Sequence, residues 1–257
     1  MCCVEQRDDG LLLRRLEDLL HRFQTRERLE TTRFLTPEEQ ARCLQHLRRA
    51  GEGRFRLWGG YEGAERQVLC LIPDWLDTAA WETGDEGPVA AVALDFTGAE
   101  LSHRDVLGAL MAAGLKRETV GDILLSPGQG TLFVLRENLG YVLSNLDRAG
   151  RVRLRLEAIP CAQVALPEKK TALERCTVAS LRTDCVLAAA WRLSRERAAE
   201  LLRQGLVQVD HLPAEKGDRL LSEGQTVSAR GQGKFRLAEV CGPTKKGRTA
   251  IIIERYL

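Results

Sequence analysis

The sequence lacks the features that mark metal sites, secreted scaffolds and membrane spans. Its eight cysteines include no Cys-x-x-Cys pair and its four histidines are dispersed, so we expect reduced thiols, no metal and no cofactor. The longest apolar runs, such as 89–94 and 251–253, are too short to cross a bilayer. No charged start followed by an apolar core marks a signal peptide, so we expect a cytoplasmic protein without membrane contact.

Signatures of nucleotide binding and catalysis are also missing. The glycine cluster at 59–63 lacks the Gly-Lys-Ser/Thr ending and the following helix of a phosphate loop, which favours a hairpin turn. The run His103-Arg104-Asp105 matches the start of a kinase loop, but Leu110 replaces the expected Asn, and helix capping by Ser102 explains the motif. No small-molecule substrate site is evident, and we expect no enzymatic activity.

The net charge of +2 is small but unevenly distributed. Residues 180–257 carry 14 Lys and Arg against 9 Asp and Glu, a net of +5, whereas residues 1–179 carry 24 against 27, a net of −3. A basic module of this kind attracts phosphate oxygens, so structured RNA is the partner class that the charge favours.

Residues 181–236 are predicted to form two short helices followed by a small β-hairpin. Ser194 is a predicted N-cap, Gly205 a left-handed helix stop, and Asp210-His211 a tight turn. A single arginine in this segment would be explained as an ordinary solvent-exposed residue. Several basic residues around one pair of helices instead favour binding of RNA phosphates. The predicted RNA-binding residues are Arg182, Arg192, Ser194, Arg195, Lys216, Arg230, Lys234 and Arg236.

The remaining pattern predicts an α+β protein with several parts. Residues 1–87 are expected to form a small α/β unit, in which Thr36-Pro37-Glu38-Glu39 starts a helix that stops at Gly51. Residues 88–165 show the order β-α-β-β-α-β of a ferredoxin-like, RRM-like domain. We expect residues 166–179 to be a linker before the basic module at 180–257.

One basic edge is predicted within the ferredoxin-like domain. The last strand, 151–159, directs Val152, Leu154 and Leu156 to one face and arginines to the other. RRM domains stack RNA bases on aromatic side chains of their sheet, and those aromatic residues are missing here. Two interpretations of the arginines remain open, contact with RNA phosphates and an ordinary solvent-exposed face. The secondary RNA-facing candidates are Arg151, Arg153 and Arg155.

Several short runs of the basic module fit a single signature. They are Arg182-Thr183-Asp184, Ser194-Arg195, Ala198, the strand start at 205–209 and the run at 221–225. Through these runs the module resembles the αL RNA-binding domain, of the type named after ribosomal protein S-four. It departs from the family pattern at Thr183, at Asp210-His211 and at Gln225, none of which removes a basic residue.

Two stretches precede the αL module, GGYEGAERQVLCLIPDW at 59–75 and SHRDVLGALMAAGLKRETVGDIL at 102–124. With these stretches in this order, most of the chain also resembles the YlmH family of bacterial RNA-binding proteins. The resemblance implies a cytosolic protein without catalytic activity that acts on the large ribosomal subunit carrying tRNA, in translation or ribosome quality control.

Two other functions stay open at this level. An RNA-modifying enzyme could use the αL module to hold rRNA or tRNA, although residues 1–170 show no catalytic motif. An adaptor could bind a protein through its amino-terminal domains and RNA through the αL module.

Overall fold

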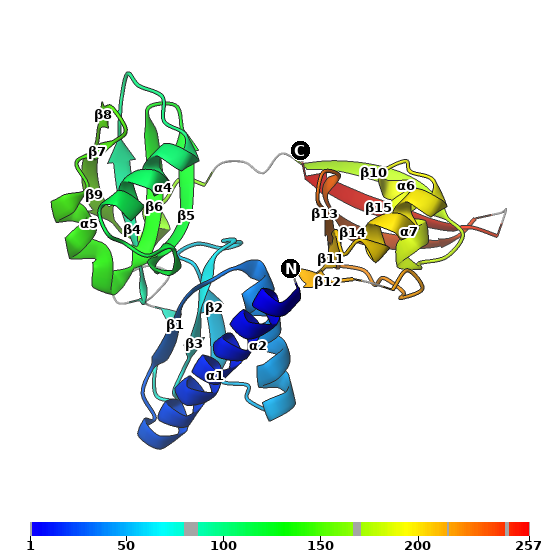
Figure 1. The fold of residues 1–257 in the computed structure, drawn as a ribbon, viewed down its shortest axis with the longest axis horizontal. Helices are drawn as coiled ribbons and strands as arrows, with labels where there is room; N and C mark the ends of the chain where they lie inside the picture. Colours follow the sequence, from blue (N-terminus) through cyan, green and yellow to red (C-terminus); the bar gives the residue numbers. More distant parts are fainter. Residues whose placement is uncertain (1, 80–86, 167–170, 215, 245–246, 257) are drawn as a thin grey trace. The chain divides into compact units, whose positions relative to one another are not determined.

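The computed structural model describes residues 2–79, 87–166, 171–214, 216–244 and 247–256. The chain forms two compact units, residues 1–167 and residues 168–257, each mixed in helix and strand (Figure 1). The fold is therefore of the predicted α+β class. Among the described residues, no helix has the length and apolar character needed to span a membrane.

The first unit begins with two helices on a three-stranded antiparallel sheet. Its elements are α1 (Cys2–Arg26), β1 (Glu30–Leu35), α2 (Pro37–Ala50), β2 (Phe55–Trp58) and β3 (Gln67–Leu71), with strand order β1-β3-β2. Both helices pack on one face of this sheet, where Phe23 and Leu47 meet Leu69 and Leu71.

The start of α2 confirms the predicted capping box. The hydroxyl oxygen of Thr36 accepts a hydrogen bond from the N–H of Glu39, the Glu39 carboxylate accepts one from the N–H of Thr36, and Gly51 ends the helix at φ +70°. Strand β1 was not predicted from the sequence. Its register shifts between Thr31 and Phe34, which interrupts the alternation expected of a strand.

The second half of this unit is a four-stranded antiparallel sheet with two helices on one face. Its strand order is β5-β6-β4-β9, the arrangement of a split β-α-β-β-α-β unit, and Val92, Leu132 and Val134 pack on the helices. The elements are β4 (Val89–Asp95), α4 (His103–Ala112), η1 (Arg117–Thr119), β5 (Val120–Ser126), β6 (Gln129–Leu135), η2 (Arg136–Asn138), α5 (Leu139–Asn145), β7 (Arg148–Ala149), β8 (Val152–Arg153), β9 (Arg155–Ile159) and η3 (Cys161–Gln163).

The predicted last strand at 151–159 is two strands. Strand β8 pairs with β7 in a separate two-stranded hairpin, and only β9 joins the sheet beside β4. The prediction was wrong here because Leu154 is buried between them and its N–H donates to the carbonyl of Asp147, which draws the chain away from the sheet.

The two halves of the first unit share a hydrophobic core. The face of the first sheet opposite α1 and α2 contributes Phe34, Trp58 and Val68, and the helix-free face of the second sheet contributes Ala91 and Phe133. The halves at 1–87 and 88–165, expected as separate domains, therefore belong to one compact unit in which the two sheets share a core. The boundary residues 80–86 lie outside the described residues.

The second unit packs two helices on a six-stranded antiparallel sheet of order β10-β15-β14-β13-β11-β12. Val186, Leu187 and Leu201 of the helices pack on Phe235 and Ile253 of the strands. The elements are β10 (Thr171–Val178), α6 (Thr183–Ala190), α7 (Arg195–Arg203), β11 (Val207–Val209), β12 (Leu212–Pro213), β13 (Thr226–Ala229), β14 (Gly233–Pro243) and β15 (Thr249–Tyr256).

Strand β10 corrects the expected linker at 166–179. All eight of its residues pair with β15, from Thr171 opposite Tyr256 to Val178 opposite Thr249, so β10 lies at the edge of the sheet in Figure 1. Exposed and partly buried residues alternate along β10, as expected of a strand. The strand was not predicted because its partner, β15, lies at the other end of the unit in the sequence. Residues 167–170 lie outside the described residues.

Candidate RNA-binding surfaces

The first turn of α6 gathers three of the predicted RNA-binding residues. Lys216 precedes Gly217, whose carbonyl accepts a 3.1 Å hydrogen bond from the N–H of Asp184. The side chain of Arg195, the first residue of α7, reaches back so that its Nη2 lies 3.1 Å from the Sγ of Cys185. Arg182 directly precedes the helix. We call Arg182, Arg195 and Lys216 the helix-start cluster; all three are exposed.

Thr183 explains how the loop that carries Lys216 is held at α6. Its hydroxyl and its N–H both donate to the carbonyl of Arg219, at 2.9 and 2.8 Å, and the residue is fully buried. A buried hydroxyl must have a partner, and here it has one. The polar residue that departs from the αL pattern thus ties the loop 216–220 to the helix start.

Arg182 is oriented by a neighbouring carboxylate. Its Nε and Nη2 donate to the two oxygens of Asp184 at 3.1 and 2.9 Å, and these hydrogen bonds are the main reason that the pKa of Asp184 is lowered. The guanidinium side chain remains 45% exposed and keeps further N–H groups free for a ligand.

Ser194 has a structural role at the start of α7. Its Oγ accepts a 3.1 Å hydrogen bond from the N–H of Arg197, which is the predicted N-cap geometry. The predicted stop at Gly205 is also confirmed at φ +67°, and Asp210 and His211 have φ of +50° and +65°, as a two-residue hairpin turn requires.

The other predicted residues of this unit lie elsewhere. Arg192 occupies the α6–α7 turn at the far end of α6, and its charge helps to lower the pKa of Glu174, which is chiefly lowered by hydrogen bonds from Arg255. Arg230 lies at the turn between β13 and β14, where its N–H donates to the carbonyl of Leu206.

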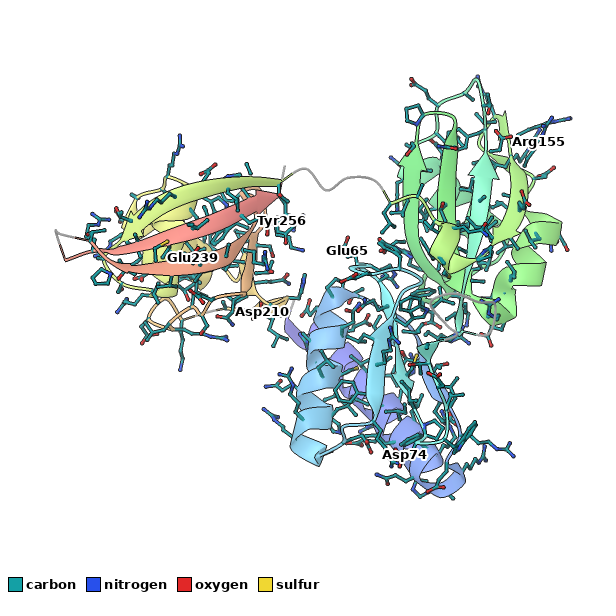
Figure 2. The ribbon with its side chains drawn as sticks, turned by 180° about the vertical axis from the view of Figure 1, so that it is seen from behind. Glu65, Asp74, Arg155, Asp210, Glu239 and Tyr256 are labelled. Carbon is teal, nitrogen blue, oxygen red and sulfur yellow. The ribbon has the colours of Figure 1, made fainter. Side chains whose placement is uncertain are left out.

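Lys234 and Arg236 lie on the face of the sheet opposite the helices. They alternate with Phe235 and Leu237, which are buried against α6 and α7, so their side chains point the other way. Arg236 forms a 2.9 Å ion pair with Glu254, and Lys234 Nζ lies 5.2 Å from the centre of the Tyr256 ring. Figure 2 views this face, with Tyr256 at one end of β15.

The predicted basic edge of the first unit is divided by the structure. Arg151 and Arg153 belong to the β7–β8 hairpin, whereas Arg155 begins β9, where its register partner is Asp95 (Figure 2). The pKa of Asp95 is lowered mainly by hydrogen bonds from Thr97, with a smaller contribution from Arg155.

Arg148 was missed among the candidates. It lies on β7 directly opposite Arg153, and both side chains are exposed. The run Asp147 to Arg153, with arginines on both sides of Ala149-Gly150, was the available signal for a hairpin.

An open groove of about 1330 Å³ lies at one end of the four-stranded sheet. On the helix-free face, its strand positions include Asp95, Gln129, Thr131 and Glu157. These are polar or acidic side chains, and none of the four can stack on a base.

The cysteines and acidic residues form no metal-binding cluster in the part of the chain that the structure describes. No group of three or more His, Cys, Asp or Glu is placed there to hold a metal ion. Burial raises the pKa of Cys43 and of Cys70 to about 12, so neither thiol is a ready nucleophile at neutral pH.

Two models of one protein family match the two halves of the first unit. Residues 12–75 match the family model described as "YlmH, N-terminal", and residues 92–163 match "Putative RNA-binding domain in YlmH". The "Ribosome-associated protein quality control protein P2" of Bacillus subtilis (strain 168) is 33% identical over 236 residues, which cover 90% of this chain and 89% of that protein. The solved structure of "Cell division protein ylmH from Streptococcus pneumoniae" aligns with a TM-score of 0.49 and 16% identity, over 60% of this chain and 92% of that chain. The chain belongs to the YlmH family.

Proposed function

We propose that this protein is a non-catalytic RNA-binding protein that docks on structured rRNA or tRNA of the large ribosomal subunit. The family model of an RNA-binding domain at 92–163 supports RNA as the ligand, and the name of the Bacillus subtilis relative supports the ribosome and its quality control as the setting. The observation that carries the proposal is the helix-start cluster, because two arginines contact the first turn of α6 and the loop that carries Lys216 is bonded to the same turn.

In the proposed mechanism, the second unit is an αL module whose helix-start cluster holds phosphate oxygens. Arg182 is oriented by Asp184, and Lys216 is held beside it by the contacts of Thr183 and Gly217. Ordering these side chains before binding lowers the entropy cost of contact. Guanidinium groups suit phosphate because they donate paired hydrogen bonds in one plane.

The remaining predicted residues are assigned lesser roles. Arg192, Arg230 and Lys234 lie on other sides of the second unit, so they would contact other segments of a folded RNA. Arg236 is partly neutralised by Glu254 and is expected to contribute little. Ser194 is proposed to act through the helix start that it caps.

The proposed binding mode predicts weak sequence preference. Structured RNA is recognised largely through its shape and backbone, and each neutralised phosphate adds about 0.7 to 0.9 to the slope of log affinity against log salt. The proposed site of action is the cytoplasm, where ribosomes translate.

Co-sedimentation of the full chain with purified large ribosomal subunits tests the function. We expect the natural chain to travel with the subunits at low salt and Arg182→Ala/Arg195→Ala to remain in the supernatant. The matched control is Arg48→Ala/Arg49→Ala, which removes two exposed arginines from the end of α2 and should bind normally.

A charge-conserving variant separates charge from folding. Arg182→Lys/Arg195→Lys should restore most of the binding, since lysine still neutralises phosphate. Failure of the natural chain to bind large subunits at any salt concentration would contradict the proposed function. Equal binding by the natural chain and the alanine variant would contradict the role of the helix-start cluster.

A further inference from the structure

The β7–β8 hairpin places two arginines directly opposite each other. Arg148 pairs with Arg153 in a ladder whose only other pair is Ala149 with Val152. Side chains in such a pair begin about 5 Å apart on the same face of the ribbon, and like charges there are destabilising. Arg151, next to Gly150 at the turn, adds a third positive charge.

The charge of this hairpin is not neutralised by the described residues around it. The side chains of Arg148, Arg151 and Arg153 are exposed and form no hydrogen bond or ion pair with any of these residues. Asp147 precedes Arg148, but it contributes its backbone carbonyl to Leu154 and no ion pair joins its carboxylate to the arginines. The fold therefore tolerates an unfavourable charge arrangement at this position.

The hairpin is nevertheless anchored to the core. Ala149 is fully buried, Leu146 and Leu154 are buried on either side of the hairpin, and Val152 packs against the same cluster of apolar residues beneath α4 and α5. This anchoring holds the arginines on a short ribbon at the surface. Three guanidinium groups with free donors, carried on one anchored ribbon, suit phosphate oxygens better than isolated lysines do.

The helix-free face of the neighbouring sheet is a poor alternative for RNA. At one end of this face, Ala91 and Phe133 are buried against Phe34 and Trp58 of the first sheet. RNA therefore cannot reach this end of the face. At the open end, Asp95 and Glu157 present two carboxylates against the one guanidinium of Arg155, so this end carries a net negative charge that would repel phosphate.

We propose that Arg148, Arg151 and Arg153, here called the arginine hairpin, contact the phosphate backbone of structured RNA, and that the open sheet face does not. This inference rests on the proposed RNA-binding function and deepens it. The hairpin lies within residues 92–163, the segment matched by the RNA-binding model, which favours RNA over an acidic protein surface as its partner.

The test compares three full-length variants with the natural chain over a series of potassium chloride concentrations. The probes are intact large ribosomal subunits and RNA extracted from them without protein. Arg148→Ala/Arg151→Ala/Arg153→Ala should reduce the slope of log affinity against log salt by about 2, from three lost phosphate contacts. Arg14→Ala/Arg48→Ala/Arg49→Ala removes the same charge from α1 and α2 and should leave the slope unchanged, as should Gln129→Glu on the sheet face.

The outcomes separate this inference from the proposed function. If the natural chain and the hairpin variant bind both probes with equal slopes, the hairpin inference is overturned while the proposed function stands. If the slope falls with intact subunits but not with protein-free RNA, the hairpin meets a ribosomal protein and the RNA assignment is wrong. If the natural chain binds neither probe, the proposed function itself fails.

Thermal unfolding checks that lost binding is not lost structure. Because the opposed arginines repel each other, the hairpin variant should unfold at the same temperature as the natural chain or at a higher one. A clear fall in the unfolding temperature would show that the arginines support the fold, which would overturn the argument from uncompensated charge.

Discussion

The hydroxyl of Tyr61 donates a 2.7 Å hydrogen bond to Oδ2 of Asp122, and this contact joins the two halves of the first unit. Asp122 also accepts hydrogen bonds from the N–H groups of Glu65 and Arg66, at 2.7 and 3.0 Å. Arg66 extends the connection, because its guanidinium donates to the carbonyls of Val120 and Phe34. One carboxylate on β5 thus holds the loop between β2 and β3.

Removal of this carboxylate should destabilise the first unit. Asp122→Ala leaves the Tyr61 hydroxyl and two backbone N–H groups without their acceptor, so we expect a loss of about 2 kcal/mol or more in the free energy of unfolding. Urea denaturation of the full chain measures the loss. Asp122→Asn keeps one carbonyl oxygen and should lose less, and Glu62→Ala, an exposed change in the same loop, should lose almost nothing.

Gly60 is required where the same loop crosses the shared core. Its φ is +97°, and a Cβ at this position would lie 2.4 Å from the nearest atom of the Phe133 ring. Gly60→Ala should therefore cost about 3 kcal/mol, from backbone strain and overpacking together. Gly140→Ala, in α5 with open space around it, should be neutral or slightly stabilising in the same denaturation experiment. Equal effects of the two changes would contradict this account.

Ser194 should affect stability and RNA binding in separable ways. Ser194→Ala removes the cap of α7 and should lower the free energy of unfolding by about 1 kcal/mol. Ser194→Asp supplies another good cap and should retain stability, but it places a negative charge next to Arg195. We expect this variant to bind large-subunit RNA more weakly than the natural chain, measured by the same sedimentation assay. Unchanged binding would argue against phosphate contact at this helix start.

The stability of the second unit should depend on pH through Glu174. Both of its carboxylate oxygens accept hydrogen bonds from Arg255, at 3.0 and 3.1 Å, and the pKa of Glu174 is lowered from its ordinary value of 4.5. A lowered pKa in the folded state means that the ionised form stabilises the fold. This contribution is present above about pH 4.5 and is lost as the pH falls through the lowered pKa.

Glu174→Gln checks this pH dependence. The variant should be less stable than the natural chain at pH 7, and the difference should shrink at pH 3, as measured by the urea midpoint. Glu239→Gln, on an exposed glutamate of strand β14 in the same sheet, serves as the control and should leave the urea midpoint close to that of the natural chain. A constant difference at both pH values would assign the effect of Glu174→Gln to packing.

Features that depend on a few neighbouring residues were predicted well. The caps at Thr36, Ser102 and Ser194 and the turn at Asp210-His211 are confirmed. In each cap a side-chain oxygen accepts a hydrogen bond from an N–H group three residues away, and the turn depends on the φ angles of two consecutive residues. These features are therefore decided by neighbouring residues and can be read from the sequence.

Strands with distant or irregular pairing were predicted less well. Strand β10 was assigned to a linker because its partner β15 lies about 80 residues later in the chain. The β7–β8 hairpin was merged with β9 because the apolar alternation continues through Leu154 although the pairing changes. Alternation reveals which side chains are buried, but not which strand lies beside them.

The sequence by itself determined the starts of α2, α4 and α7, the glycine stops after α2 and α7, the excess of positive charge in residues 180–257, and the residues that carry the YlmH family resemblance. Only the tertiary structure decided which basic residues lie close to one another. It brings Lys216 to Arg182 through the contacts of Thr183, turns Lys234 to the opposite face of the sheet, and sets Arg148 against Arg153. The physical reason is that capping and turn formation act over a few residues, whereas a shared surface depends on packing and strand register between distant segments.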